Sequence, residues 1–183
     1  MKDHLIWKTE KKTRVFTGRV FDVEEVTSCS PENKSGTFSV IKSSDWAIVI
    51  PVLETERGKE FVMVWQWRHG SETLSLEFPG GVFEEGENAE MAAKRELLEE
   101  TGLTPGSLIK LGEFSPNPAI MSNRVHFFLA ENPVANGKQS LDDDEYVDIE
   151  LVPEKEVIKK MGKEPFIHAL MGTALALYLK NKI

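Results

Sequence analysis

Three carboxylates near the middle of the chain have a spacing that suits metal chemistry. Glu96, Glu99 and Glu100 are three and four residues apart, so on an α-helix their side chains fall on one stripe. Two of them lie near the expected C-terminal end of that helix, where the dipole disfavours an anion by up to about 1 kcal/mol. A hard divalent cation would turn the repulsion into coordination. The alternative is a solvated acidic surface.

The helix that must hold these carboxylates is predicted over residues 89–101. Asn88 is a suitable N-cap, helix-favouring residues fill the segment, and Gly102 suits the left-handed residue that ends a helix. The apolar side chains on the other side of the helix are expected to dock on the core: Met91, Leu97 and Leu98.

The sequence around this helix resembles the signature of the Nudix hydrolases. It runs from Gly81 through Glu87 to Arg95-Glu96-Leu97-x-Glu99-Glu100-x-Gly102-Leu103 and matches the signature at its constrained positions. The resemblance implies a loop-helix-loop that binds Mg²⁺ or Mn²⁺ and hydrolyses a nucleoside diphosphate linked to another group.

The resemblance also implies roles for single residues. Glu96, Glu99 and Glu100 would be metal ligands, with the carbonyl of Gly80 as a further ligand, and Glu99 and Glu100 count among the catalytic residues. An ion pair between Glu87 and Arg95 would hold the helix and the preceding loop in one geometry.

The fold implied by the resemblance is α/β, a Nudix α/β/α sandwich with a mixed β-sheet. Near-continuous apolar runs at 45–53 and 60–67 predict central strands, because such strands are covered on both faces. Further strands are expected at 108–114 and 123–130, a short helix at 153–161 and an amphipathic helix at 165–180. In the last helix, Met171 and Tyr178 are expected in the core.

Residues 1–44 are expected to form a small antiparallel β-subdomain ahead of a Nudix domain at 45–183. Three short strands make a sheet too small to stand alone. Four aromatic residues are expected in its core, with stacking on a nucleobase as the alternative for any one of them: Trp7, Phe16, Phe21 and Phe38. In the branch of the family that hydrolyses ADP-ribose and nucleoside diphosphate sugars, a similar N-terminal sheet pairs with its counterpart in a homodimer.

Substrate-binding residues are expected where the second central strand becomes polar. Gln66 and Arg68 match a Gln-x-Arg that the sugar-nucleotide branch carries at this place, and an arginine there would bind a diphosphate through charge-assisted hydrogen bonds. Glu77, which precedes Phe-Pro-Gly-Gly, resembles the family's glutamate beside the substrate. Arg68 on the open surface and Glu77 bonded within the sheet remain the alternatives.

The general base is expected in the acidic segment after residue 140. Water that attacks phosphorus needs a nearby carboxylate, and the helix carboxylates would be occupied by metal. ADP-ribose hydrolases place a catalytic glutamate in a loop here, which favours Glu145 over its rivals Asp143 and Asp144. The alternative is a solvated acidic loop.

Composition narrows the classes of partner and the compartment. The chain of 183 residues has a net charge of −8, which argues against nucleic acid and anionic membranes as partners. Cys29 is the single cysteine, so no intrachain disulfide is possible and a reducing cytoplasm is the expected setting. No segment reads as a signal peptide or a membrane span.

Together these features predict Mg²⁺-dependent hydrolysis of nucleoside diphosphate sugars, such as ADP-ribose or GDP-mannose, to a nucleoside monophosphate and a sugar phosphate. A nucleoside triphosphate or dinucleoside polyphosphate hydrolase is the alternative enzyme. A Nudix-like module that binds a ligand without catalysis is the alternative from another class, although no glutamate of the signature is missing.

Overall fold

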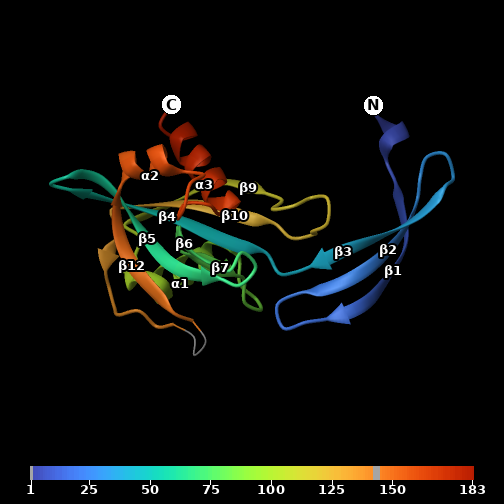
Figure 1. Cartoon of the computed structure of the whole chain (residues 1–183), viewed down its shortest axis with the longest axis horizontal. Helices are drawn as coiled ribbons and strands as arrows, with labels where there is room; N and C mark the ends of the chain where they lie inside the picture. Colours follow the sequence, from blue (N-terminus) through green and yellow to red (C-terminus); the bar gives the residue numbers. More distant parts are fainter. Residues whose placement is uncertain (1, 142–144) are drawn as a thin grey trace. The chain divides into compact units, whose positions relative to one another are not determined.

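The computed structural model describes residues 2–141 and 145–183. Its contacts divide the chain into two compact units (Figure 1). One unit contains the residues up to Ser44 together with Ser115–Arg124, and the other contains Asp45–Phe114 and Val125–Ile183. Among the described residues, no helix is long and apolar enough to cross a membrane.

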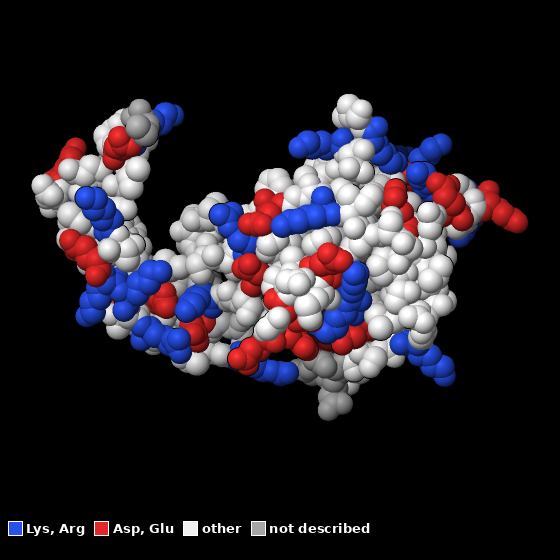
Figure 2. All heavy atoms as spheres, turned by 180° about the vertical axis from the view of Figure 1, so that it is seen from behind, with Lys and Arg blue, Asp and Glu red and all other residues white. Residues whose placement is uncertain are grey.

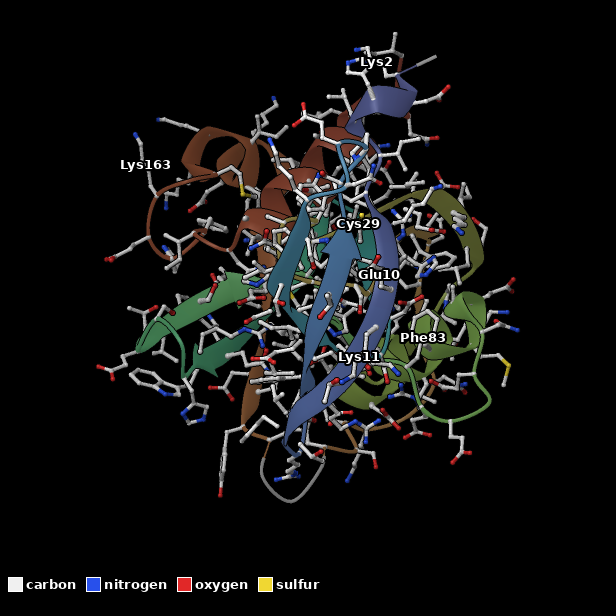
Figure 3. All side chains as sticks on the ribbon, turned by 90° about the vertical axis from the view of Figure 1, so that its right-hand side faces the viewer. Lys2, Glu10, Lys11, Cys29, Phe83 and Lys163 are labelled. Carbon is white, nitrogen blue, oxygen red and sulfur yellow. The ribbon has the colours of Figure 1, made fainter. Side chains whose placement is uncertain are left out.

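The first unit is built on a three-stranded antiparallel sheet. A short 3-10 helix, η1 (Asp3–Leu5), precedes the strands β1 (Lys8–Thr17), β2 (Asp22–Cys29) and β3 (Ser35–Lys42), which pair in that order. The segment 115–124 attaches to the end of β3, where Ile41 N–H donates to the Ile120 carbonyl at 2.7 Å and Ser122 N–H donates to the Ile41 carbonyl at 3.1 Å. Figure 3 looks onto this sheet, with Glu10 and Lys11 on β1 and Cys29 at the end of β2.

The expectation that four aromatic residues form the core of this sheet is wrong. Trp7, Phe16, Phe21 and Phe38 are each between 42 and 52% exposed. They meet instead in two pairs, Trp7 with Phe38 at 5.4 Å between ring centroids and Phe16 with Phe21 at 6.1 Å. A single sheet has no second layer within its own unit to cover them, and every residue of β1 is exposed.

The second unit contains a mixed sheet, as predicted, with seven strands among the described residues. Its main path runs β12-β5-β4-β10-β9, with β6 added to β5 and β7 added to β4. Strands β4 and β10 are parallel, and the other pairs are antiparallel. The strands are β4 (Trp46–Thr55), β5 (Gly58–Arg68), β6 (Thr73–Glu77), β7 (Gly80–Val82), β9 (Ser107–Phe114), β10 (Val125–Glu131) and β12 (Val147–Pro153).

Helices cover both faces of this sheet, which confirms the predicted α/β/α sandwich. They are α1 (Ala89–Thr101) on one face, and α2 (Glu154–Lys160) and α3 (Ala169–Lys180) on the other (Figure 1). Alternate residues of β4 point to the two layers, because successive strand side chains face opposite ways. Ile48 and Ile50 pack with α3, and Ala47 and Val49 pack with α1.

The end of the chain differs from the sequence prediction in one boundary. Helix α3 starts at Ala169 and not near 165, because the residues before it bond to the edge of the sheet: Leu76 N–H of β6 donates to the Pro165 carbonyl at 3.1 Å. Met171 and Tyr178 are 2 and 3% exposed, which confirms their place in the core. A small antiparallel pair, β8 (Leu103–Thr104) with β11 (Val134–Ala135), follows α1.

Candidate active site

Helix α1 has the predicted ends, and Leu97 packs on the core as predicted. The Asn88 side chain accepts hydrogen bonds from the N–H groups of Glu90 and Met91, both at 3.0 Å, and Gly102 ends the helix at φ +68°. The buried apolar residues are Ala92, Ala93 and Leu97, whereas Met91 is 51% exposed. The expectation that Met91 packs on the core is therefore wrong.

The docking of α1 carries two of the carboxylates inward. Glu96 and Glu100 are 8 and 3% exposed, on the same side of the helix as Ala93 and Leu97. The small alanine side chains let the helix approach β4 closely, so the longer glutamates extend along the interface. Glu99 remains partly exposed, at 38% of its side chain. The carboxylate stripe thus borders the core and is not a solvated acidic surface.

Arg95 neutralises much of this charge. Its Nη1 donates to Glu96 Oε1 at 2.8 Å and to Glu99 Oε2 at 2.9 Å. Its Nε and Nη2 donate to the two carboxylate oxygens of Glu87, at 2.8 and 3.0 Å, and Nη2 also donates to the Val82 carbonyl at 2.9 Å. The geometry thus contains the expected Glu87–Arg95 pair, extended to two further carboxylates.

Glu87 serves the preceding loop as well as the helix. Its Oε2 accepts the N–H of Glu84 at 2.9 Å, and Arg95 is the first cause of a lowered pKa of this carboxyl, followed by the hydrogen bond from Glu84. The loop at 83–88 is thereby tied to the helix through one carboxylate.

The glycine turn lies directly against the buried carboxylates. Gly80 N–H donates to Glu100 Oε2 at 2.9 Å, and Gly80 has φ +158°. A Cβ at Gly80 would stand 2.2 Å from the Ala47 carbonyl oxygen, and a Cβ at Gly81 would stand 2.4 Å from Glu96 Oε1. Position 80 requires glycine because a side chain would collide with the backbone of the sheet, whereas a side chain at position 81 would displace the Glu96 carboxylate.

Burial raises the pKa of both inward carboxyls. Desolvation is the main cause in each case, and it raises the pKa of Glu96 to about 7 and the pKa of Glu100 to about 8. Arg95 opposes the shift at Glu96, whereas the charge of Glu96 adds to the shift at Glu100. A carboxylate so buried, bonded to Gly80 N–H, needs a compensating positive charge when it ionises.

The donor set at this turn suits a hard divalent cation. Carboxylates of Glu96, Glu99 and Glu100 and the Gly80 carbonyl are all oxygen donors, the type that Mg²⁺ and Mn²⁺ prefer. Over residues 2–141 and 145–183, no three acidic, histidine or cysteine side chains are already gathered as a ligand set. Arg95 Nη1 holds one oxygen each of Glu96 and Glu99.

Arg68 and Glu77, both expected near the substrate, bind each other. Arg68 Nε and Nη2 donate to the two oxygens of Glu77 at 2.8 and 2.7 Å, across the paired strands β5 and β6. The pKa of Glu77 is lowered; burial opposes the shift and the Arg68 hydrogen bond drives it. This geometry agrees with the alternative in which Glu77 is bonded within the sheet. The Arg68 side chain is still 38% exposed.

Gln66 and Glu145 are the remaining predicted residues that the structure describes. Gln66 is half-buried on β5, two residues before Arg68 and thus on the same face of the strand. Glu145 is exposed, and its charge contributes to the raised pKa of both Glu96 and Glu100. Asp143 and Asp144 lie outside the described residues.

His168 is a neighbour of this site that the sequence did not indicate. Its Nδ1 lies 3.7 Å from Glu77 Oε2, at the residue before α3. Burial is the first cause of a lowered pKa of this imidazole, and the charge of Glu77 opposes the shift. No local pattern marks His168, because it reaches Glu77 only through the packing of α3 beside β6.

The chain belongs to the NUDIX domain family, whose model matches residues 44–170. It is 37% identical to the "ADP-ribose pyrophosphatase" of Bacillus subtilis over 178 residues, covering 96% of this chain and 93% of the relative. It is 29% identical to the "Methanol dehydrogenase activator" of Bacillus methanolicus over 78% of this chain and 76% of the relative. Nudix hydrolases generally need divalent metal ions.

A solved structure supports the fold over nearly the whole chain. The structure described as "Crystal structure of ADP compounds hydrolase" superposes with a TM-score of 0.83 and covers 97% of each chain, at 21% identity. At 21% identity this similarity shows the fold alone, and it extends over both the mixed sheet and the three-stranded sheet.

Proposed function

We propose that this protein is a Nudix pyrophosphohydrolase that cleaves the diphosphate bond of nucleoside diphosphate sugars, with ADP-ribose as the first substrate to test. The observation that carries the proposal is the position of Glu100, a buried carboxylate held against the Gly80 backbone beside Glu96. The relative with the printed name "ADP-ribose pyrophosphatase" aligns with almost the full length of the chain.

Mg²⁺, or Mn²⁺ in its place, would be held by Glu96, Glu99, Glu100 and the Gly80 carbonyl. When bound, such an ion supplies positive charge for the diphosphate and lowers the pKa of a coordinated water. Arg95 and Glu87 keep the helix and the loop before it in register. Glycine at positions 80 and 81 lets the Ala47 carbonyl and the Glu96 carboxylate lie close to the backbone of the turn.

Other residues of the chain bind the substrate and move a proton. Arg68, fixed in orientation by Glu77, presents its exposed edge to a phosphate oxygen, and Gln66 lies on the same strand face. Glu145 accepts the proton of the attacking water, since its charge already acts on the Glu96 and Glu100 carboxyls. The products are a nucleoside monophosphate and a sugar phosphate.

The N-terminal unit is proposed to form a homodimer through its sheet. This unit exposes more apolar side chains than the scattered ones that are normal on a protein surface. They are Leu5, Ile6, Trp7, Val15, Phe16, Val20, Phe21 and Phe38. Strand β1 is an edge strand exposed along its length, and edge strands of this kind pair readily with another chain. We assign the sheet to dimerisation and residues 45–183 to the hydrolase domain.

A substrate screen tests the proposed function directly. Purified protein is assayed with Mg²⁺ against ADP-ribose, GDP-mannose, UDP-glucose, diadenosine polyphosphates and nucleoside triphosphates, and the products are separated by chromatography. ADP-ribose or another nucleoside diphosphate sugar should give the highest kcat/KM, with a nucleoside monophosphate as product. A preference for triphosphates would instead assign the protein to the rival enzyme class.

The compartment of the enzyme and the partners it should not bind are inferred from its composition. A single cysteine, partly exposed and free, is compatible with a reducing compartment, so we place the enzyme in the cytoplasm. Acidic and basic side chains are mixed over the face shown in Figure 2. With a net charge of −8, the protein is not expected to bind nucleic acid or an anionic membrane.

A further inference from the structure

The C-terminal carbonyls of α1 are bonded to a segment far along the chain. The last four carbonyls of a helix have no partner within the helix. Gly102 N–H donates to the Leu98 carbonyl at 2.7 Å, Ser140 N–H donates to the Glu99 carbonyl at 2.9 Å, and the Gln139 side chain donates to the Glu100 carbonyl at 2.7 Å. Residues 139 and 140 therefore serve as an external cap on the helix that carries the carboxylates.

Gln139 also reaches the start of β12. Its Nε2 donates a second hydrogen bond, 3.2 Å long, to the Val147 carbonyl. The amide nitrogen carries two hydrogens, and these two carbonyls use both. Val147 pairs with Gln66 in the β12–β5 ladder, so the amide connects the helix of Glu100 with the strand beside a substrate-binding residue.

We infer that Gln139 is a positioning residue for the general base, an inference that rests on the proposed function. Glu145 lies two residues before Val147, whose carbonyl the amide holds. Because the same amide is bonded to the Glu100 carbonyl of α1, the contact limits the range over which the Glu145 carboxylate can move relative to the carboxylates of the helix. Gln139 would act through Glu145, without contacting the substrate or the attacking water.

The donor-free variant Gln139→Met tests the inference in kinetics. Its side chain has nearly the same length but no N–H groups, so kcat for ADP-ribose should fall roughly tenfold to a hundredfold, the loss expected when a reacting group is displaced by about 1 Å. KM and the Mg²⁺ concentration for half-maximal rate should stay within about twofold of wild type. An unchanged kcat would overturn the inference. A KM that changes by as large a factor as kcat would overturn it too.

A control and a second background separate positioning from general damage. Lys138→Met places the same side chain at the neighbouring exposed residue and should keep kcat within about twofold. In a Glu145→Gln background, Gln139→Met should cause almost no further loss, because residues that act as one unit are not additive. A full second loss in that background would show that Gln139 does not act through Glu145.

Hydrogen exchange gives a readout that needs no substrate. In Gln139→Met, peptides covering 138–149 should exchange faster, whereas peptides from α3 should not change. If the wild type fails to hydrolyse any nucleoside diphosphate sugar, the proposed function is wrong, yet this exchange pattern still decides whether Gln139 anchors the segment. Unchanged exchange at 138–149 contradicts the anchor even when the enzyme is active.

Discussion

Arg68 of β5 and Glu77 of β6 make a two-point contact along the paired strands, although the register sets Arg68 opposite Thr73; Glu77 is only 1% exposed and Arg68 reaches toward solvent. The pair has two consequences. The carboxylate could not be buried so deeply without its arginine, and the arginine could not keep one orientation without its carboxylate.

Removal of the arginine should therefore weaken the fold. Arg68→Met leaves the Glu77 carboxylate buried without its partner, and the free energy of unfolding should fall by about 3 kcal/mol. Urea denaturation followed by tryptophan fluorescence measures this change. The double variant Arg68→Met with Glu77→Leu should recover much of the loss, because no charge is then buried. Lys110→Met breaks only the exposed pair with Glu113 and should cost less than about 1 kcal/mol.

Substitution of the carboxylates proposed to bind metal should lower activity, whereas substitution of another acidic residue of the same helix should not. Glu99→Gln and Glu100→Gln should each lower kcat about a hundredfold or more and raise the Mg²⁺ concentration needed for activity. Glu90→Gln is the matched control, since the Glu90 side chain is exposed and, among the described residues, bonds only to Lys94 four residues on. Full turnover by Glu100→Gln would exclude the proposed metal-site mechanism.

The metal-free protein should lose stability as pH rises. Glu96 and Glu100 have pKa values of about 7 and about 8 in the folded chain, against 4.5 for an ordinary glutamate. Between pH 4.5 and 8 the folded state thus binds more protons than the unfolded state, so the free energy of unfolding decreases with rising pH across that window.

Thermal unfolding in EDTA at a series of pH values measures this dependence. The difference in Tm between wild type and the double variant Glu96→Gln with Glu100→Gln isolates the two groups. The Tm of the wild type should fall relative to the variant from pH 5 to 8. Saturating Mg²⁺ should raise the wild-type Tm most at the upper end, because a metal ligand must be deprotonated. A relative Tm that climbs with pH would contradict the assignment.

The apolar side chains of the N-terminal sheet should control association. Replacing Phe16 and Phe38 together by glutamate should weaken dimerisation at least about 30-fold, the effect of losing one interface hot spot. Sedimentation velocity at several protein concentrations measures it. Leu179→Glu changes an apolar residue that is similarly exposed on α3 and should leave association intact. A wild type that sediments as a monomer at high concentration would rule out the dimer.

Local signals predicted much of α1 and of the mixed sheet. The helix has the expected bounds because Asn88 and Gly102 are capping residues whose effect is confined to one turn. The apolar runs of β4 and β5 fit central strands because both faces of the sheet are covered.

Other features depend on contacts between distant segments. The docking of α1 was predicted correctly at Leu97 and wrongly at Met91, because Ala92 and Ala93 pack against β4 instead. The Arg68–Glu77 pair depends on the register of β5 and β6, and the Gln139 contacts depend on where the chain returns after β11. The exposed aromatics of the first unit follow the pattern of a core although no layer of that unit covers them.

Arg95 gives the acidic helix a counter-ion that is part of the chain. In many small metalloproteins, folding and metal binding are one event, and a chelator unfolds the protein. Here the guanidinium already bonds to Glu87, Glu96 and Glu99, so we expect the helix to fold without a bound ion. Metal would then bind to a folded scaffold, and we expect the enzyme to lose its ion and take up another without refolding.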